Sequence, residues 1–363
     1  MASGEKFINL AMIKERQSNI EALRIVAMIF IVLLHANYFS LGSISQADIL
    51  SSPFPSFVRM FCEQICIVGV NIFVLISGWF GIRPTFKGAV SILYQVFFFS
   101  LLILLVGIIV AIPIPGLKII KLFYFGGHYW FIPAYLCLYT ISPILNSYID
   151  SSNRNEALLI ILAYFCLEFI YGWLADMAAF NEGYSAMSFI GLYLIARYIN
   201  KYPTRLKSIK PVFSFGLYLV FSIIPTIIAL FGLKYIGHAF SPIKYCSPFV
   251  VLASLFLFLT FQGLKIKSKF INWIAGSVFA VYIFHLNPMV ENYFKEIMNT
   301  AFQSLNGALY CLFSIGVAIF LCLVCAIPDQ LRLVSWRYIC SFSSKKVYPI
   351  IERIYKNSLQ KII

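Results

Sequence analysis

Two ionisable side chains, Arg24 and His35, lie inside one apolar run of the sequence and are eleven positions apart. Eleven residues make close to three turns of an α-helix, so both side chains share one face and lie about 16 Å apart along the axis. An imidazole can act as a general base or a transient nucleophile near neutral pH, and a guanidinium can hold phosphate. Ionisable groups at membrane depth usually face a bundle interior or a wet cavity, so this shared face is a candidate functional site.

The chain around this pair has the composition of a polytopic membrane protein. Of its 363 residues, 61% are hydrophobic and 12% are charged, whereas soluble domains average about 45–50% and about 25%. Weakly charged apolar runs of about 18 residues or more, long enough to cross a hydrocarbon core, recur from residue 20 to residue 328. We therefore predict an all-α, polytopic bundle of about ten transmembrane helices, at roughly 20–40, 57–80, 89–112, 128–149, 156–174, 184–200, 212–232, 246–264, 271–290 and 305–327.

The distribution of basic residues predicts the orientation of this bundle. Most of the 28 Lys and Arg residues fall in one set of alternating connections, and short loops rich in these residues face the cytoplasm. We therefore expect both termini to be cytoplasmic, in a multi-pass protein of the inner (cytoplasmic) membrane. The expected domains are a cytoplasmic lead at 1–19, a transmembrane domain at 20–328 and a basic amphipathic cytoplasmic tail at 329–363.

The net charge of +14 does not indicate a nucleic-acid partner, because the basic residues follow one membrane face and do not form a single folded patch. Contact with the lipid bilayer explains them. Among the nine cysteines, Cys62/Cys66 and Cys322/Cys325 have spacings that a metal site could use, but no histidine lies near either pair in sequence. We therefore predict packed thiols and no metal site. The sequence makes no prediction of oligomeric state.

A structural explanation exists for each polar residue of the first span. Glu21, which shares the same helical face, and Arg24 could form a charged pair that snorkels at the end of the span. His35 could be a buried histidine with satisfied hydrogen bonds. However, all four histidines map to the outer half or the outer loops of the expected topology, which favours a functional role for His35. They are His35, His128, His238 and His285.

Two carboxylates are expected at a similar outer depth. Glu63 lies about 9 Å from the outer end of the second span, and Glu168 lies at a similar level in the fifth. Either carboxylate could orient the imidazole of His35 and stabilise its protonated form. Pairing with a buried tyrosine or a backbone group is the alternative for both, and the sequence does not choose between them.

The second span ends in polar residues at the expected cytoplasmic edge. Asn71 and Ser77 lie in its last turns, and Arg83 and Lys87 follow in a short loop. Cations at a membrane edge suit phosphate groups. The general bias of basic residues toward the cytoplasm would also place them there.

Four stretches of the sequence form an ordered set of motifs from the first span to the ninth. They are "NIEALRIVAMIFIVLLH", "VNIFVLISGWF", "HYWFIPAYLCLYTISPIL" and "SVFAVYIFHL". With these motifs the chain resembles the acyltransferase family 3 membrane proteins, which include bacterial surface-polysaccharide O-acetyltransferases. The resemblance covers nearly the whole chain.

The resemblance makes Arg24 and His35 the essential pair of the first span. It also makes Ser77 and Gly78 part of the second-span signature, and it places His128 and Trp130 at the start of the fourth span. Many relatives carry two arginines in an R-x-x-R arrangement after the second span. Here Arg83 is followed by Lys87 at a different spacing, which leaves the donor-binding role of this loop open.

The implied reaction is acyl transfer, most often of acetyl from coenzyme A, to a hydroxyl of a cell-surface or lipid-linked carbohydrate. Acetyl-CoA or another acyl-CoA would be a co-substrate, with no permanently bound cofactor. We predict His35 as general base or transient acyl carrier, oriented by Glu63 or Glu168. The residues expected to hold the donor are Arg24, Arg83, Lys87, Asn71 and Ser77, and those expected at the outer, acceptor-binding mouth are His128, Trp130 and His285.

Two other functions fit parts of the sequence. A transporter or flippase for a lipid-linked saccharide would line a passage with the same polar face and would change no bond. A membrane-bound partner protein would use the basic tail after Asp329 as a dock. The first alternative predicts no label on a glycan after incubation with labelled acetyl-CoA, and the second predicts that Arg24 and His35 tolerate substitution.

Overall fold

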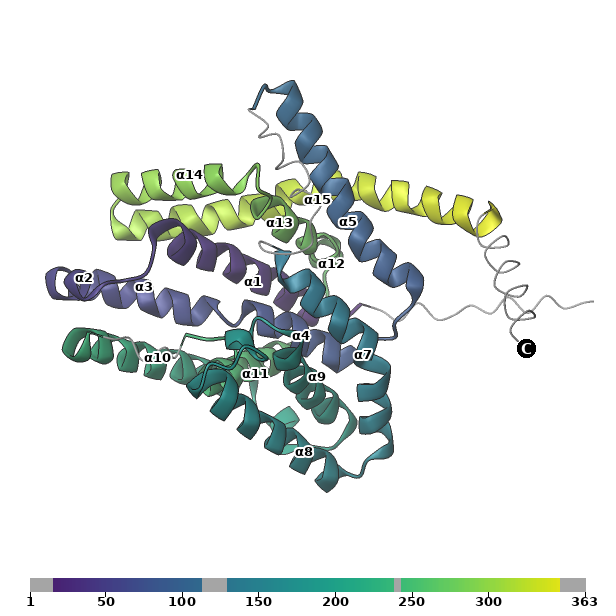
Figure 1. The fold of residues 1–363 in the computed structure, drawn as a ribbon, viewed down its shortest axis with the longest axis horizontal. Coiled ribbons are helices and arrows are strands. Elements are labelled where there is room, and N and C mark those ends of the chain that lie inside the picture. The colour runs from purple at the N-terminus through teal and green to yellow at the C-terminus, as the bar shows by residue number, and fades with distance from the viewer. Residues whose placement is uncertain (1–15, 113–128, 238–242, 347–363) are drawn as a thin grey trace, which may run out of the picture.

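The computed structural model describes residues 16–112, 129–237 and 243–346, and the regular secondary structure of these residues is helical (Figure 1). Six helical segments in this part are long and apolar enough to cross a membrane. They are Ser18–Phe39, Pro53–Phe80, Phe86–Ile109, Arg154–Leu174, Pro211–Ile236 and Gly307–Phe342, and Pro248–Gln262 is a shorter apolar helix. The predicted polytopic helical membrane bundle is therefore confirmed.

The structure shows six such segments where about ten spans were predicted. Two of the other predicted spans correspond to short helices, α9 (Ala186–Lys201) and α11 (Pro248–Gln262). A third, 271–290, is broken into α12 (Lys269–Ala275) and α13 (Val278–His285). The fourth corresponds to α7 (Phe131–Ser151), which has an internal proline and several polar side chains. A continuous apolar stretch of sequence therefore does not predict where a helix breaks.

The remaining elements follow the chain in order. They are α1 (Ser18–Leu34), the π-helix η1 (His35–Phe39), α2 (Gln46–Ser51), α3 (Pro53–Cys66), α4 (Gly69–Phe80), α5 (Phe86–Ile109), α8 (Arg154–Leu167), the π-helix η3 (Glu168–Leu174), the 3₁₀ turns η4 (Asn181–Gly183) and η5 (Arg205–Ser208), α10 (Pro211–Ile236), α14 (Glu291–Ser304) and α15 (Gly307–Lys346).

The first helix lies at the centre of the bundle and packs against α3, α4, α11, α12, α13 and α15. Its side chains at Ile20, Leu23 and Ala27 are fully buried. The start of α4 approaches it closely, because a Cβ atom at Gly69 would lie 2.7 Å from the carbonyl oxygen of Ala27. Small residues at such contacts let membrane helices approach backbone to backbone. A central α1 means that the face carrying Arg24 and His35 points into protein and away from lipid.

The last helix continues past the boundary expected at residue 328. With 40 residues, α15 is about 60 Å long and crosses behind α5 in Figure 1. Asp329 and Arg332 are buried in it and form an ion pair of 2.9 Å. The segment predicted as a tail therefore begins inside the packed bundle. Residues 347–363 and most of the predicted lead at 1–19 lie outside the described residues.

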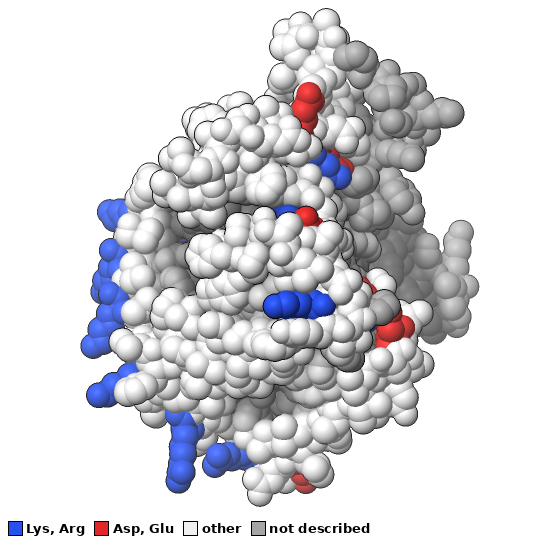
Figure 2. Space-filling view, turned by 90° about the vertical axis from the view of Figure 1, so that its left-hand side faces the viewer, with Lys and Arg blue, Asp and Glu red and all other residues white. Residues whose placement is uncertain are grey.

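Charge is unevenly distributed over the surface. Figure 2 shows Lys and Arg gathered along one edge of the molecule, whereas most of the visible face carries no charge. Large apolar side chains are exposed on α5, α10 and α15, among them Ile109, Phe231 and Ile327. A broad apolar surface with cations at one margin is typical of a protein embedded in a bilayer.

Candidate active site

The imidazoles of His35 and His285 form a buried hydrogen bond, with 2.8 Å between Nδ1 of His35 and Nε2 of His285. The two side chains are 8% and 1% exposed. On its other side, Nδ1 of His285 lies 2.6 Å from the carbonyl oxygen of Val281, one turn earlier in α13. The pair joins the end of α1 to the end of α13.

This arrangement determines which nitrogen carries each proton. The carbonyl oxygen of Val281 can only accept, so Nδ1 of His285 carries a hydrogen. A neutral imidazole has one N–H group, so Nε2 of His285 accepts a hydrogen bond from Nδ1 of His35. Two facing cations would be costly in this buried position, which favours the neutral forms. The lone pair of His35 Nε2 is therefore left for a reacting group.

The backbone at His35 departs from a regular α-helix. His35 is the first residue of the π-helix η1, and single π-turns occur frequently at functional sites. Ser40 donates a hydrogen bond to the carbonyl oxygen of His35 at 3.0 Å, and the ring of Phe39 meets the imidazole edge-to-face at 4.7 Å. The first contact holds the backbone of His35 and the second holds its ring. Neither contact can be read from the sequence alone.

Neither predicted carboxylate is hydrogen-bonded or ion-paired to His35 in the part of the chain that the structure describes. Glu63 is half-buried on α3 and interacts electrostatically with Arg59 and Tyr184. Glu168 is buried at the first residue of η3, beside Ser188, and its Oε2 atom has no hydrogen-bond partner among the described residues. Among the described residues, the side chain hydrogen-bonded to the imidazole of His35 is therefore that of His285, and not that of Glu63 or Glu168.

At the other end of α1, Glu21 bridges two arginines. Its Oε2 lies 3.8 Å from Nε of Arg24, and its Oε1 lies 3.5 Å from Nε of Arg16. Arg16 also donates to the backbone carbonyl of Asn272 at 2.7 Å. Because Glu21 is only 6% exposed, this cluster is more than a snorkelling pair. Two arginines at one carboxylate give this end of the bundle a concentrated positive charge.

A tyrosine that the sequence analysis did not single out lies close to Arg24. Tyr135 of α7 interacts electrostatically with Arg24, and its hydroxyl is 3.2 Å from Oγ of Ser77. Ser77 donates its hydrogen to the carbonyl oxygen of Phe73, so Tyr135 is the donor in the second bond. Tyr135 lies within the motif that begins at His128, and this was the signal that could have identified it.

The other residues predicted to hold the donor have different environments. Asn71 is buried, and its side chain donates to the carbonyl oxygen of Tyr245 at 2.9 Å. This bond gives Asn71 a structural role between α4 and the segment before α11. Arg83 and Lys87 are exposed in the connection between α4 and α5 and at the start of α5.

Trp130 belongs to an aromatic cluster. Its ring centroid lies 4.5 Å from that of Tyr184 and 5.8 Å from that of Tyr245. Phe131 and Tyr282 continue this cluster to His285, whose ring lies 6.4 Å from Tyr282. His128, the remaining residue predicted at the acceptor mouth, lies outside the described residues.

In the described ranges, no group of three His, Cys, Asp or Glu side chains is arranged to hold a metal ion. The helical bundle defines a polytopic integral membrane protein whose core holds a hydrogen-bonded pair of imidazoles. A family model described as an acyltransferase domain matches residues 17–327. The chain belongs to acyltransferase family 3 and is a membrane-bound O-acyltransferase. Searches for a similar curated protein and for a similar solved structure gave no significant match.

Proposed function

We propose that this enzyme transfers an acetyl group from acetyl-CoA to a hydroxyl of a cell-surface or lipid-linked carbohydrate. The observation that supports it best is the hydrogen-bonded pair of His35 and His285, which leaves Nε2 of His35 unprotonated. A base of this kind is what attack by a sugar hydroxyl on a thioester requires.

One base is enough for both proton transfers of this reaction. Nε2 of His35 takes the proton as the acceptor oxygen attacks the acetyl carbonyl carbon and the new C–O bond forms. The C–S bond then breaks, and the imidazolium returns the proton to the leaving thiolate. During the transfer, Nδ1 of His35 keeps its hydrogen bond to His285, which stabilises the positive charge. In a covalent variant, the same Nε2 would carry the acetyl group between the two substrates.

The donor would bind at the Arg24 end of α1. Arg24 and Arg16 can hold the phosphates of coenzyme A in place of Glu21. Tyr135, which is hydrogen-bonded to Ser77, interacts with Arg24 at the same end. Arg83 and Lys87 would add positive charge at this edge. This arrangement requires the predicted topology, with both termini in the cytoplasm and the His35 end on the outer side of the inner membrane.

The test uses purified protein in nanodiscs, acetyl-CoA labelled in the acetyl group, and saccharides extracted from the native membrane. We expect label on the saccharide, and we expect His35→Ala to lower kcat by about 10² to 10⁴, the usual contribution of general base catalysis. Leu33→Ala, a partly buried neighbour in α1, is the matched control. Saccharide movement across the membrane without any label on it would favour the transporter and overturn the proposal.

A further inference from the structure

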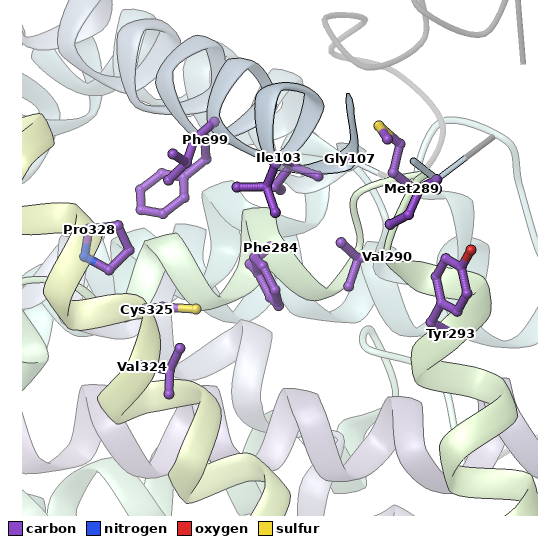
Figure 3. Close-up of a pocket in the computed structure, with 13 residues that line it drawn as sticks. Phe99, Ile103, Gly107, Phe284, Met289, Val290, Tyr293, Val324, Cys325 and Pro328 are labelled. Carbon is purple, nitrogen blue, oxygen red and sulfur yellow. The ribbon is translucent and has the colours of Figure 1, made fainter. Parts of the chain in front are cut away.

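A cavity of about 270 Å³ lies between α5, α13, α14 and α15. Figure 3 shows Phe99, Ile103 and Gly107 of α5 along one side, Phe284 of α13 at the centre and Val324 of α15 on the opposite side. Its lining is almost wholly apolar. An apolar cavity of about 150 Å³ stays dry and takes up benzene. This cavity is larger and partly open, with Val106 and Tyr293 about half exposed, so it is suited to a hydrocarbon chain that enters from the surface of the bundle.

The cavity and the imidazole pair both involve the end of α13. Phe284 lines the cavity, and the next residue, His285, is hydrogen-bonded to His35. The ring of Phe294 on α14 lies 5.9 Å from that of His285 on the same side of the bundle. A chain held against Phe284 would thus contact the sequence neighbour of His285, the hydrogen-bond partner of the proposed base.

One end of the cavity lies near the imidazole pair. Phe284, Met289 and Val290 line this end and flank His285 in sequence. From here the lining runs inward along α15 to Pro328. A chain that fills the cavity therefore has one end close to His285, which suits an acceptor that reacts at His35.

The cation of Lys295 lies beside the imidazole pair, on α14, which also lines the cavity at Tyr293. Nζ of Lys295 is 5.5 Å from the centre of the Phe39 ring, which contacts His35. Lys295 is paired with Glu291, and a third of its side chain is exposed. Its ammonium group is placed to attract an anionic linker, such as a phosphate between a lipid chain and a sugar.

We propose that the cavity receives the hydrocarbon chain of a lipid-anchored saccharide acceptor and thereby brings a sugar hydroxyl to Nε2 of His35. The inference rests on the proposed acetyl transfer and narrows its acceptor to lipid-linked carbohydrates. Gly107 lets the terminal methyl group of Met289 pack against α5 in this lining, because a Cβ atom there would collide with it.

A binding experiment tests the cavity without any turnover. Protein in phosphatidylcholine nanodiscs is irradiated with a diazirine-bearing polyprenyl phosphate, and the labelled peptides are identified by mass spectrometry. We expect label on α5, α14 and α15, about fivefold less in Ile103→Trp, and unchanged label in the control Leu105→Trp, which is exposed on the same helix. Equal labelling by a diazirine phosphatidylcholine that polyprenyl phosphate does not displace would show a bulk-lipid site and overturn the proposal.

An activity experiment separates this inference from the proposed function. Labelled acetyl-CoA is offered with a lipid-linked saccharide from the native membrane, or with the same saccharide after mild acid has removed the lipid. We expect Ile103→Trp to raise KM for the lipid-linked acceptor about tenfold and to leave kcat/KM for the released saccharide within twofold. Equal use of both acceptors by the unsubstituted enzyme overturns the inference and leaves acetyl transfer intact.

Two further outcomes would each overturn one of the two proposals. Photolabelling of the cavity without transfer to either acceptor would overturn the proposed function and support the lipid site. A preference for dodecanoyl-CoA over acetyl-CoA that Ile103→Trp alone abolishes would assign the cavity to the donor's chain and overturn the inference.

Discussion

His35 and His285 are 250 residues apart in sequence, and their ring nitrogens meet at 2.8 Å inside the membrane bundle. The contact gives His35, the proposed base, a neutral hydrogen-bond acceptor in place of the carboxylate found in many acid–base pairs. A neutral acceptor orients His35 and fixes its tautomer without placing a second charge in an apolar setting.

Under the proposed mechanism His285 positions the base, so its replacement should affect kcat more than KM. We expect His285→Leu to lower kcat about 100-fold, because Nδ1 of His35 loses its acceptor and the tautomer is no longer fixed. His285→Gln should recover about tenfold of this loss, since its amide oxygen can accept the same hydrogen bond. Steady-state kinetics of both variants check this. A leucine variant with unchanged kcat and an unchanged pH profile would contradict the assigned role.

Arg16 and Arg24 should act together on the donor. We expect Arg24→Ala to raise KM for acetyl-CoA at least tenfold and Arg16→Ala to raise it about threefold, because each removes a charge-assisted contact to phosphate. The effect should shrink at high salt, since Arg16 is about half exposed. Arg154→Ala, at the start of α8, is a control for general surface charge. Equal KM values in all three variants would show that the donor's phosphates bind elsewhere.

The buried ion pair of Asp329 and Arg332 should matter for stability. Asp329 also accepts hydrogen bonds from Gln95 of α5 and from Ser277 at the start of α13, so it links three elements. Arg332→Leu leaves this carboxylate without its cation, and the expected loss in free energy of unfolding is about 3–5 kcal/mol.

Denaturation of the protein in detergent, followed by circular dichroism, measures this loss. The double variant with Asp329→Leu and Arg332→Leu should be more stable than the single Arg332→Leu variant, because no charge is left buried alone. A double variant that is less stable than the single one would rule out this explanation.

Two glycines offer a matched test of helix packing. A Cβ atom at Gly78 would lie 2.5 Å from the carbonyl oxygen of Tyr193, whereas one at Gly216 would meet nothing within 4 Å. We expect Gly78→Ala to separate α4 from α9 and to lower the thermal unfolding temperature by several degrees. Gly216→Ala should stabilise α10 by up to about 1 kcal/mol, because alanine loses less conformational freedom in a helix. Equal unfolding temperatures would contradict the close backbone contact.

Lys244 should hold the segment that carries Tyr184 in place until strongly alkaline pH. Its ammonium group lies 3.1 Å from Asp176 and 3.2 Å from Glu182. Burial lowers the pKa of Lys244, but the hydrogen bonds and charges of these carboxylates outweigh it, so the pKa is raised from its ordinary value.

Because the folded-state pKa is the higher one, this contribution to stability is fully present below the unfolded pKa of about 10.4. It is lost as pH rises through the raised, folded-state value. Unfolding temperatures measured from pH 7 to 11 should therefore fall at the alkaline end in the unsubstituted protein, and Lys244→Met should lack this step. The same alkaline fall in both proteins would assign it to another group.

The membrane bundle and the shared helical face of Arg24 and His35 could be predicted from local patterns. Apolar runs long enough to cross a bilayer are read directly from the chain, and the spacing of Arg24 and His35 follows from the geometry of one helix. Helix breaks were harder to predict. The expected span at 271–290 is interrupted after Ala275 and after His285, where local backbone geometry and packing override a continuous apolar pattern.

The sequence by itself therefore determined the class of protein and the helical face that carries Arg24 and His35. Only the tertiary structure decided that His285 and not Glu63 or Glu168 contacts His35, that Tyr135 lies beside Arg24, and that Asp329 is buried. The physical reason is that periodicity and hydropathy act over a few turns of one helix. Contacts between helices depend on their tilts and breaks, and on small residues such as Gly69, whose effects combine only when the whole bundle is packed.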